Sequence, residues 1–188
     1  MSGQIIQYRD DLVRCFVDTE FYEDGKTIDL ISLGAVRSDG REFYAVSSEA
    51  KLDRVSEWVR DNVLPHLPPQ GDPAWQTRSE IALGFSAFMI GLDREKIGET
   101  WEQVGEVWGY YSDYDWVGIC QLYGTMMGLP THFPMYCLDL KQLSWMLGNP
   151  KHPEQETGEH HALHDARWNR DLFAFLRTVP SGVRRYGR

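Results

Sequence analysis

The pattern of apolar and polar residues divides the chain into a strand-rich first part and a mixed remainder. Segments 13–17, 28–37 and 42–46 are rich in β-branched and aromatic residues, and Ser38-Asp39-Gly40-Arg41 is a turn signal between the last two. They predict an antiparallel meander of three strands. Two more strands are expected at 104–112 and 135–138, and helices at 54–63, 79–91, 115–127, 139–147 and 162–177.

Three antiparallel strands followed by strands that alternate with helices predict an α/β fold, with a mixed five-stranded sheet and helices on both faces. The 188 residues are enough for one sizeable core. No repeat or long linker interrupts the pattern. We therefore expect residues 1–188 to form a single domain, with its core at about 14–177.

Charge limits the classes of function. The net charge of −9 argues against a protein that coats long nucleic acid, because such proteins carry a basic face. It leaves room for an enzyme that holds a few nucleotides, since carboxylates in a metal site would be neutralised by bound cations. The basic tail, Arg184, Arg185 and Arg188, is either solvated or in contact with such a substrate.

The cysteines predict an intracellular location. Cys15, Cys120 and Cys137 are odd in number and widely spaced in apolar surroundings, which indicates buried, reduced thiols. No apolar run reaches the roughly 18 residues needed to span a membrane, and the first residues do not resemble a secretory signal. The expected compartment is the cytoplasm.

Asp18 and Glu20 are the first candidates for chemistry. They are two residues apart at the expected end of the strand 13–17, so their side chains should point to the same face. Two oxygen ligands of this kind suit Mg²⁺ or Mn²⁺. A second Asp-x-Glu, Asp93-Arg94-Glu95, has no apolar strand before it and is interpreted as exposed surface. The competing interpretation of the first pair is a strand end that simply reaches solvent.

Asp115 is the middle candidate, because it follows one expected strand and begins the next helix. Asp113 competes with it, and an aspartate at this place also makes a good helix N-cap. Asp139, after the strand 135–138, is a similar rival that we expect to cap the helix that follows.

His160 and Asp165 complete the set. On one regular helix they would be about 140° apart, so they can share a site only if His160 lies on a loop and Asp165 in the first helical turn. Gly158 favours that arrangement. A zinc site that uses His160, His161 and His164 is an alternative, and surface histidines are another.

Together these residues resemble the DEDDh family of 3′-5′ exonucleases in the RNase H-like superfamily. The order is Asp18-Thr19-Glu20, then Tyr114-Asp115, then His160-His161-Ala162-Leu163-His164-Asp165-Ala166. Tyr114-Asp115-Trp116-Val117, the segment 58–65 and the short length are most similar to the compact exoribonuclease branch of mycobacteria and bacteriophages. One departure is that many relatives have an Asn a few residues before the middle Asp, where this chain has Tyr111, Ser112 and Asp113.

The resemblance implies metal-dependent release of nucleoside 5′-monophosphates from RNA 3′ ends. Two divalent ions, Mg²⁺ or Mn²⁺, would be bound by Asp18, Glu20, Asp115 and Asp165, with Asp18 bridging them. His160 would be the general base, and Phe21 would contact the terminal base or sugar unless it is a core residue.

Several alternatives remain open at the level of sequence. The same site could act on DNA, the substrate could be single-stranded or a 3′ overhang, or the chain could be a silent nucleic-acid-binding module or a zinc-binding structural protein. Seven tryptophans and nine tyrosines make a homodimer plausible.

Overall fold

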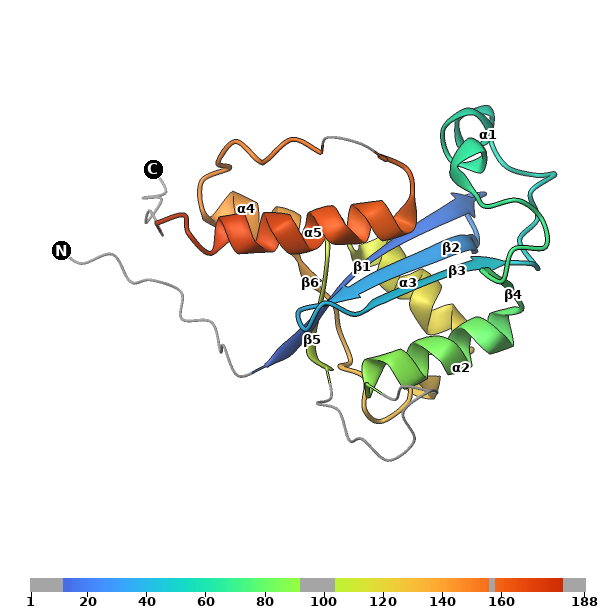
Figure 1. Cartoon of the computed structure of the whole chain (residues 1–188), viewed down its shortest axis with the longest axis horizontal. Coiled ribbons are helices and arrows are strands. Elements are labelled where there is room, and N and C mark those ends of the chain that lie inside the picture. The colour runs from blue at the N-terminus through green and yellow to red at the C-terminus, as the bar shows by residue number, and fades with distance from the viewer. Residues whose placement is uncertain (1–11, 92–103, 156–157, 181–188) are drawn as a thin grey trace.

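The computed structural model describes residues 12–91, 104–155 and 158–180. Its centre is a six-stranded sheet in the order β4-β3-β2-β1-β5-β6 (Figure 1). The strands are β1 (Val13–Glu23), β2 (Ile28–Arg37), β3 (Glu42–Ser47), β4 (Trp75–Gln76), β5 (Val104–Gly109) and β6 (Leu138–Asp139).

The predicted meander is present, because β1 pairs antiparallel with β2 and β2 with β3. β5 then joins β1 in parallel, and β6 joins β5 in parallel, which makes the sheet mixed as expected. The sequence predicts five strands, whereas the sheet has six. Trp75 and Gln76 pair in parallel with Val46 and Ser47 as β4, in a segment that had not been assigned a strand.

β1 is longer than its apolar pattern predicts. The ladder with β2 continues past Val17 to the pair Glu23 and Ile28, because backbone hydrogen bonds do not depend on side-chain polarity. The prediction that Asp18 and Glu20 mark the end of the strand is therefore wrong, and both lie inside it. Ile31 has no partner in β1, since Glu20 is opposite Ser32 and Phe21 is opposite Leu30, so β2 carries a bulge beside Glu20.

Helices cover both faces of the sheet, as predicted (Figure 1). α2 and α3 pack on one face, and α4 and α5 pack on the other. The helices are α1 (Glu57–Asn62), α2 (Arg78–Met89), α3 (Asp113–Leu122), α4 (Leu140–Met146) and α5 (Ala162–Leu176), with short 3₁₀ turns η1 (Leu64–His66) and η2 (Met126–Gly128). Within these described residues, no helix has the length and apolar character needed to cross a bilayer.

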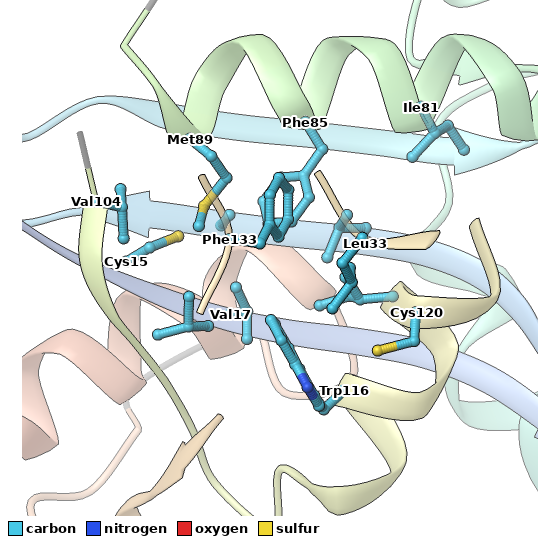
Figure 2. Close-up of a cluster of buried hydrophobic side chains, with 14 of the residues drawn as sticks. Cys15, Val17, Leu33, Ile81, Phe85, Met89, Val104, Trp116, Cys120 and Phe133 are labelled. Atoms are coloured by element: carbon cyan, nitrogen blue, oxygen red, sulfur yellow. The ribbon is translucent and has the colours of Figure 1, made fainter. Parts of the chain in front are cut away.

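The larger core lies between the sheet and the pair α2 and α3. Figure 2 shows Val17 and Leu33 from the sheet facing Phe85 from α2 and Trp116 from α3. A second apolar cluster, centred on Phe16 and Phe173, joins the opposite face to α4 and α5. All three cysteines are free thiols; Cys15 and Cys120 are buried and Cys137 is half-buried.

Gly34 lets α5 approach the sheet closely. It lies opposite Asp18 in the β1–β2 ladder, and a Cβ atom at this position would be 2.2 Å from the backbone carbonyl of Ala162. Only a residue without a side chain fits there. The first turn of α5 is thus held directly beside the acidic part of β1.

Candidate active site

Three carboxylates meet between β1 and α5. Asp18 and Glu20 are on the same side of β1, because side chains two residues apart in a strand share a face. Asp165 is added from the first turn of α5. Each of the three offers one oxygen, and these oxygens all lie within 4.8 Å of one another. Oxygen ligands at this spacing suit a hard divalent cation.

His160 lies on the loop before α5, which is the arrangement that a site shared with Asp165 requires. α5 begins at Ala162, so His160 is outside the helix, and its φ of 65° is unusual for a residue other than glycine. Asp165 is fixed by two donors: the backbone N–H of His161 donates to Oδ2 at 3.1 Å, and the Gln155 side-chain amide donates to Oδ1 at 2.6 Å. The loop and the helix therefore position His160 and Asp165 together.

Burial separates Asp115 from its rival Asp113. Asp113 is exposed, whereas Asp115 is 5% exposed. Asp115 Oδ1 accepts a hydrogen bond from the Thr19 backbone N–H at 2.9 Å and another from the Thr19 hydroxyl at 2.6 Å. Asp115 is not one of the three clustered carboxylates, but it is held against β1 next to Asp18.

The expected helix caps are only partly correct. Ser112, not an aspartate, is the N-cap residue of α3, and it makes no side-chain capping bond. Asp139 caps α4 as predicted, since its Oδ1 accepts from the Gln142 backbone N–H at 2.6 Å. Its other oxygen accepts from the Ser112 N–H at 2.8 Å, which links the starts of α3 and α4.

The acids oppose one another's ionisation. Burial, followed by the charges of Asp115, Asp165 and Glu20, raises the pKa of Asp18 well above its ordinary value. Burial and the charges of Asp165 and Asp115 raise the pKa of Glu20 to about 8. Burial raises the pKa of Asp115 to about 7, although the bonds from Thr19 act in the opposite direction. A bound cation would compensate this negative charge, so the donors fit a metal site in number, type and electrostatics.

A cavity of about 600 Å³ opens over the acids. Asp18, His160 and Asp165 line it, together with Tyr110 and Asn169. The volume is within the range of roughly 300–1,000 Å³ usual for small-molecule sites.

The rings around the cavity distinguish His160 from His161. The edge of the Trp58 ring meets His160 with 4.8 Å between centroids. The ring of His161 instead stacks on Tyr44 at 4.6 Å and on His164 at 4.3 Å, and His161 is not among the residues that line the cavity. The zinc alternative gains no support, because among the described residues the cluster close enough to hold an ion is the carboxylate group.

The remaining sequence candidates have different outcomes. Phe21 is half-buried and stacks on Tyr114, with 5.6 Å between centroids and 5° between planes. Its contact with substrate stays a prediction. The second Asp-x-Glu, at 93–95, and the basic tail, at 184–188, lie outside the described residues.

Sequence reasoning missed three residues of this region. Asn169 follows Asp165 by four positions, so helical spacing could have found it; its amide donates to the Val17 carbonyl at 2.9 Å. Thr19 lies between the two predicted acids, but the sequence did not identify it as a residue of the site. Gln155 is on an irregular loop, where no periodic pattern points to a site.

A mixed sheet in this order, with acids from its central strand and from a helix packed beside it, defines the class as an RNase H-like fold with an acidic site. The family model of the 3′-5′ exoribonuclease Rv2179c-like domain matches residues 13–176, and the chain belongs to this family. Two curated relatives, the 3′-5′ exoribonucleases MT2234.1 and Rv2179c of Mycobacterium tuberculosis strains CDC 1551 / Oshkosh and ATCC 25618 / H37Rv, are each 43% identical to it. The similarity extends over 157 residues, which are 82% of this chain and 88% of each relative.

Proposed function

We propose that this protein is a metal-dependent 3′-5′ exoribonuclease, with residues 1–188 as one exonuclease domain. The observation that carries the proposal is the cluster of Asp18, Glu20 and Asp165, two of which, Asp18 and Asp165, line one cavity with His160. Membership of a family described as exoribonucleases supports RNA as the substrate. The products are nucleoside 5′-monophosphates, released one at a time from the 3′ end.

The acids of the site would hold two divalent cations, Mg²⁺ or Mn²⁺. Asp18, Glu20 and Asp165 would be ligands, and Asp115 would support the ions with the oxygen that Thr19 does not contact. Bound cations supply an acidified water and neutralise charge on the phosphate.

His160 accepts the proton of the attacking water, a role that its place in the cavity wall supports. Water attacks the terminal phosphorus, and the bond to the 3′ oxygen of the preceding nucleotide breaks. That oxygen takes a proton from the solvent and becomes the 3′ hydroxyl of the shortened strand.

Aromatic side chains next to the acids provide a surface for the terminal nucleotide. Phe21 follows Glu20 directly and forms a stacked pair with Tyr114, a residue that is 51% exposed. Stacking on such a pair accepts any base. Single-stranded RNA or a 3′ overhang is the proposed form of the substrate, and a homodimer is the proposed assembly.

One experiment tests the activity. Single strands and 3′-overhang duplexes of RNA and DNA, labelled at the 5′ end, are incubated with Mg²⁺, Mn²⁺ or EDTA. The expected result is a stepwise ladder that shortens RNA from its 3′ end and disappears in EDTA. Faster shortening of DNA than of RNA would contradict RNA as the substrate and would indicate an exodeoxyribonuclease. Internal cleavage products or an absence of turnover would refute exonuclease action.

A further inference from the structure

A second cavity lies beside the β1–β2 hairpin and the start of α2, and it differs in charge from the rest of the protein. Its volume is about 240 Å³, and its walls carry the cationic side chains Lys51, Arg54 and Arg78 together with the acids Asp24 and Asp29. We call it the basic pocket. Three cations in one small cavity are unexpected in a chain with a net charge of −9, and they favour an anionic ligand.

The two acids of the basic pocket are already engaged. Asp24 Oδ1 accepts from the backbone N–H groups of Lys26 at 2.9 Å and Thr27 at 2.8 Å. Asp29 pairs with Arg78 through Oδ1, and its Oδ2 accepts from the Lys51 backbone N–H at 3.1 Å. One positive charge is left in excess, because three cations face two carboxylates.

The donors of the pocket are not all used. Within the described parts of the chain, the ammonium group of Lys51 and the guanidinium of Arg54 form no hydrogen bond or ion pair. Arg78 Nε is buried and has no partner there either, while Nη2 of the same guanidinium pairs with Asp29. A guanidinium that is paired with one acid and keeps an N–H without a partner can donate a hydrogen bond to an oxygen of a bound anion.

Two segments join the basic pocket to the candidate active site. Tyr22, in the pocket wall, follows Glu20 by two residues in β1, which is about 7 Å along a strand. Arg54 is on the segment that leads into α1, where Trp58 meets the ring of His160. A nucleic-acid strand with its 3′ end at the acids can therefore reach the pocket with a phosphate farther from that end.

We propose that the basic pocket binds a phosphodiester group of the RNA strand, upstream of the bond that is cleaved. The pocket is smaller than the roughly 300 Å³ at which ordinary small-molecule sites begin, so it suits a phosphate group and not a whole nucleotide. This proposal rests on the proposed function, and it adds a second point of attachment that only longer RNA can use.

The test compares two substrates and two charge-matched variants. Lys51→Ala/Arg54→Ala removes two cations from the pocket, and Arg60→Ala/Arg170→Ala removes two cations elsewhere, exposed Arg60 and half-buried Arg170. Rates are measured on a dodecamer RNA and on a dinucleotide over a range of salt concentrations. For the pocket variant, kcat/KM on the dodecamer is expected to fall about tenfold at low salt. The dependence of log KM on log salt should become shallower by about 0.7 for each lost phosphate contact.

The dinucleotide should be cleaved by the pocket variant at the wild-type rate, and the control variant should match wild type on both substrates. Equal losses on both substrates, or no loss on either, would overturn the proposal. Inorganic phosphate is added as a competitor. If it displaces the dodecamer from the wild type and from the pocket variant equally well, phosphate binding at the pocket is excluded.

The two proposals fail in different ways. Absence of wild-type turnover on the dinucleotide and the dodecamer would refute the proposed function. Binding of a fluorescent dodecamer in EDTA, measured by anisotropy, tests the pocket without turnover. Equal affinity of wild type and pocket variant in that assay would refute RNA binding at the basic pocket and would leave the proposed function unaffected.

Discussion

Thr19 donates two hydrogen bonds to one oxygen of Asp115. Its backbone N–H and its hydroxyl reach Asp115 Oδ1 at 2.9 and 2.6 Å, across the whole stretch of chain between β1 and α3. Thr19 is only 5% exposed, so water cannot replace these two hydrogen bonds to Asp115 if they are lost. The carboxylate is thereby held in one orientation, with Oδ2 left for other partners.

Removal of the Thr19 hydroxyl should reduce both stability and turnover. In Thr19→Val, Asp115 loses one buried donor, which costs about 1–3 kcal/mol of unfolding free energy. Urea unfolding and kcat at saturating Mg²⁺ measure the two effects. Thr19→Ser keeps the hydroxyl and should recover most of the turnover. If the valine variant matched wild type in kcat, Thr19 would have no part in positioning Asp115.

Metal-free protein should lose stability as the pH rises. Burial and neighbouring acids raise the pKa of Glu20 from 4.5 to about 8 and that of Asp115 from 3.8 to about 7. A group with a higher pKa in the folded state binds its proton more tightly there. Its stabilising effect is therefore complete below the unfolded pKa and is lost as the pH passes the folded value. In EDTA, the melting temperature should fall between about pH 4 and pH 8, the range that the unfolded and folded pKa values of Glu20 and Asp115 span.

Added Mn²⁺ should reverse this trend, because a cation replaces the protons as the partner of the carboxylates. The gain in melting temperature should grow with pH, and Asp165→Asn should lose most of it. A melting temperature that is independent of both Mn²⁺ and pH in the wild type would contradict a metal site at these acids.

Replacement of His160 should separate catalysis from metal binding. His160→Ala lacks the proposed proton acceptor, so kcat is expected to fall by about 10²- to 10⁴-fold. The Mn²⁺-dependent gain in melting temperature should persist, since the three clustered ligands are intact. His66→Ala, at an exposed histidine, is the control and should keep full activity. Near wild-type turnover of the His160 variant at saturating Mg²⁺ would exclude His160 as the base.

A methyl group at Gly34 should disrupt the contact that places Asp165. The added Cβ would lie 2.2 Å from the Ala162 backbone, so α5 must shift, at a cost of about 1–3 kcal/mol or more. Chemical unfolding and Mn²⁺ affinity should both show the loss. Gly118→Ala is a suitable control, because its Cβ would meet nothing closer than 3.9 Å, on a helix that alanine favours. Similar stability of the two variants would mean that α5 adapts freely.

The sequence predicted the positions of most elements because their apolar patterns are local. α5 was expected at 162–177 and is present at Ala162–Leu176. β4 could not be foreseen, since Trp75 and Gln76 form a strand only through pairing with β3. The apolar pattern predicts a strand that ends at Val17, because the residues that follow are polar, whereas the observed length of β1 is set by the ladder with β2.

The site shows the same limit. The acids Asp18, Glu20 and Asp165 could be selected from spacing and order, and the structure brings them together. Asp113 and Asp115 are distinguished by their burial, and the local sequence at 113–115 does not indicate which of the two is buried. The bonds from Thr19 to Asp115 and from Gln155 to Asp165 join residues that no periodic pattern connects.

The proximity of Glu20 and Asp165 also has a consequence for the time at which the site forms during synthesis. One residue belongs to the first strand and the other to the last described helix, so their meeting depends on contacts of very large sequence separation. Such contacts require a large loop-closure entropy before they form, and they are slow to form. A nascent chain that still lacks α5 would carry two acids without the third ligand or His160. Activity against RNA would therefore arise only after α5 has been synthesised and has packed on the sheet.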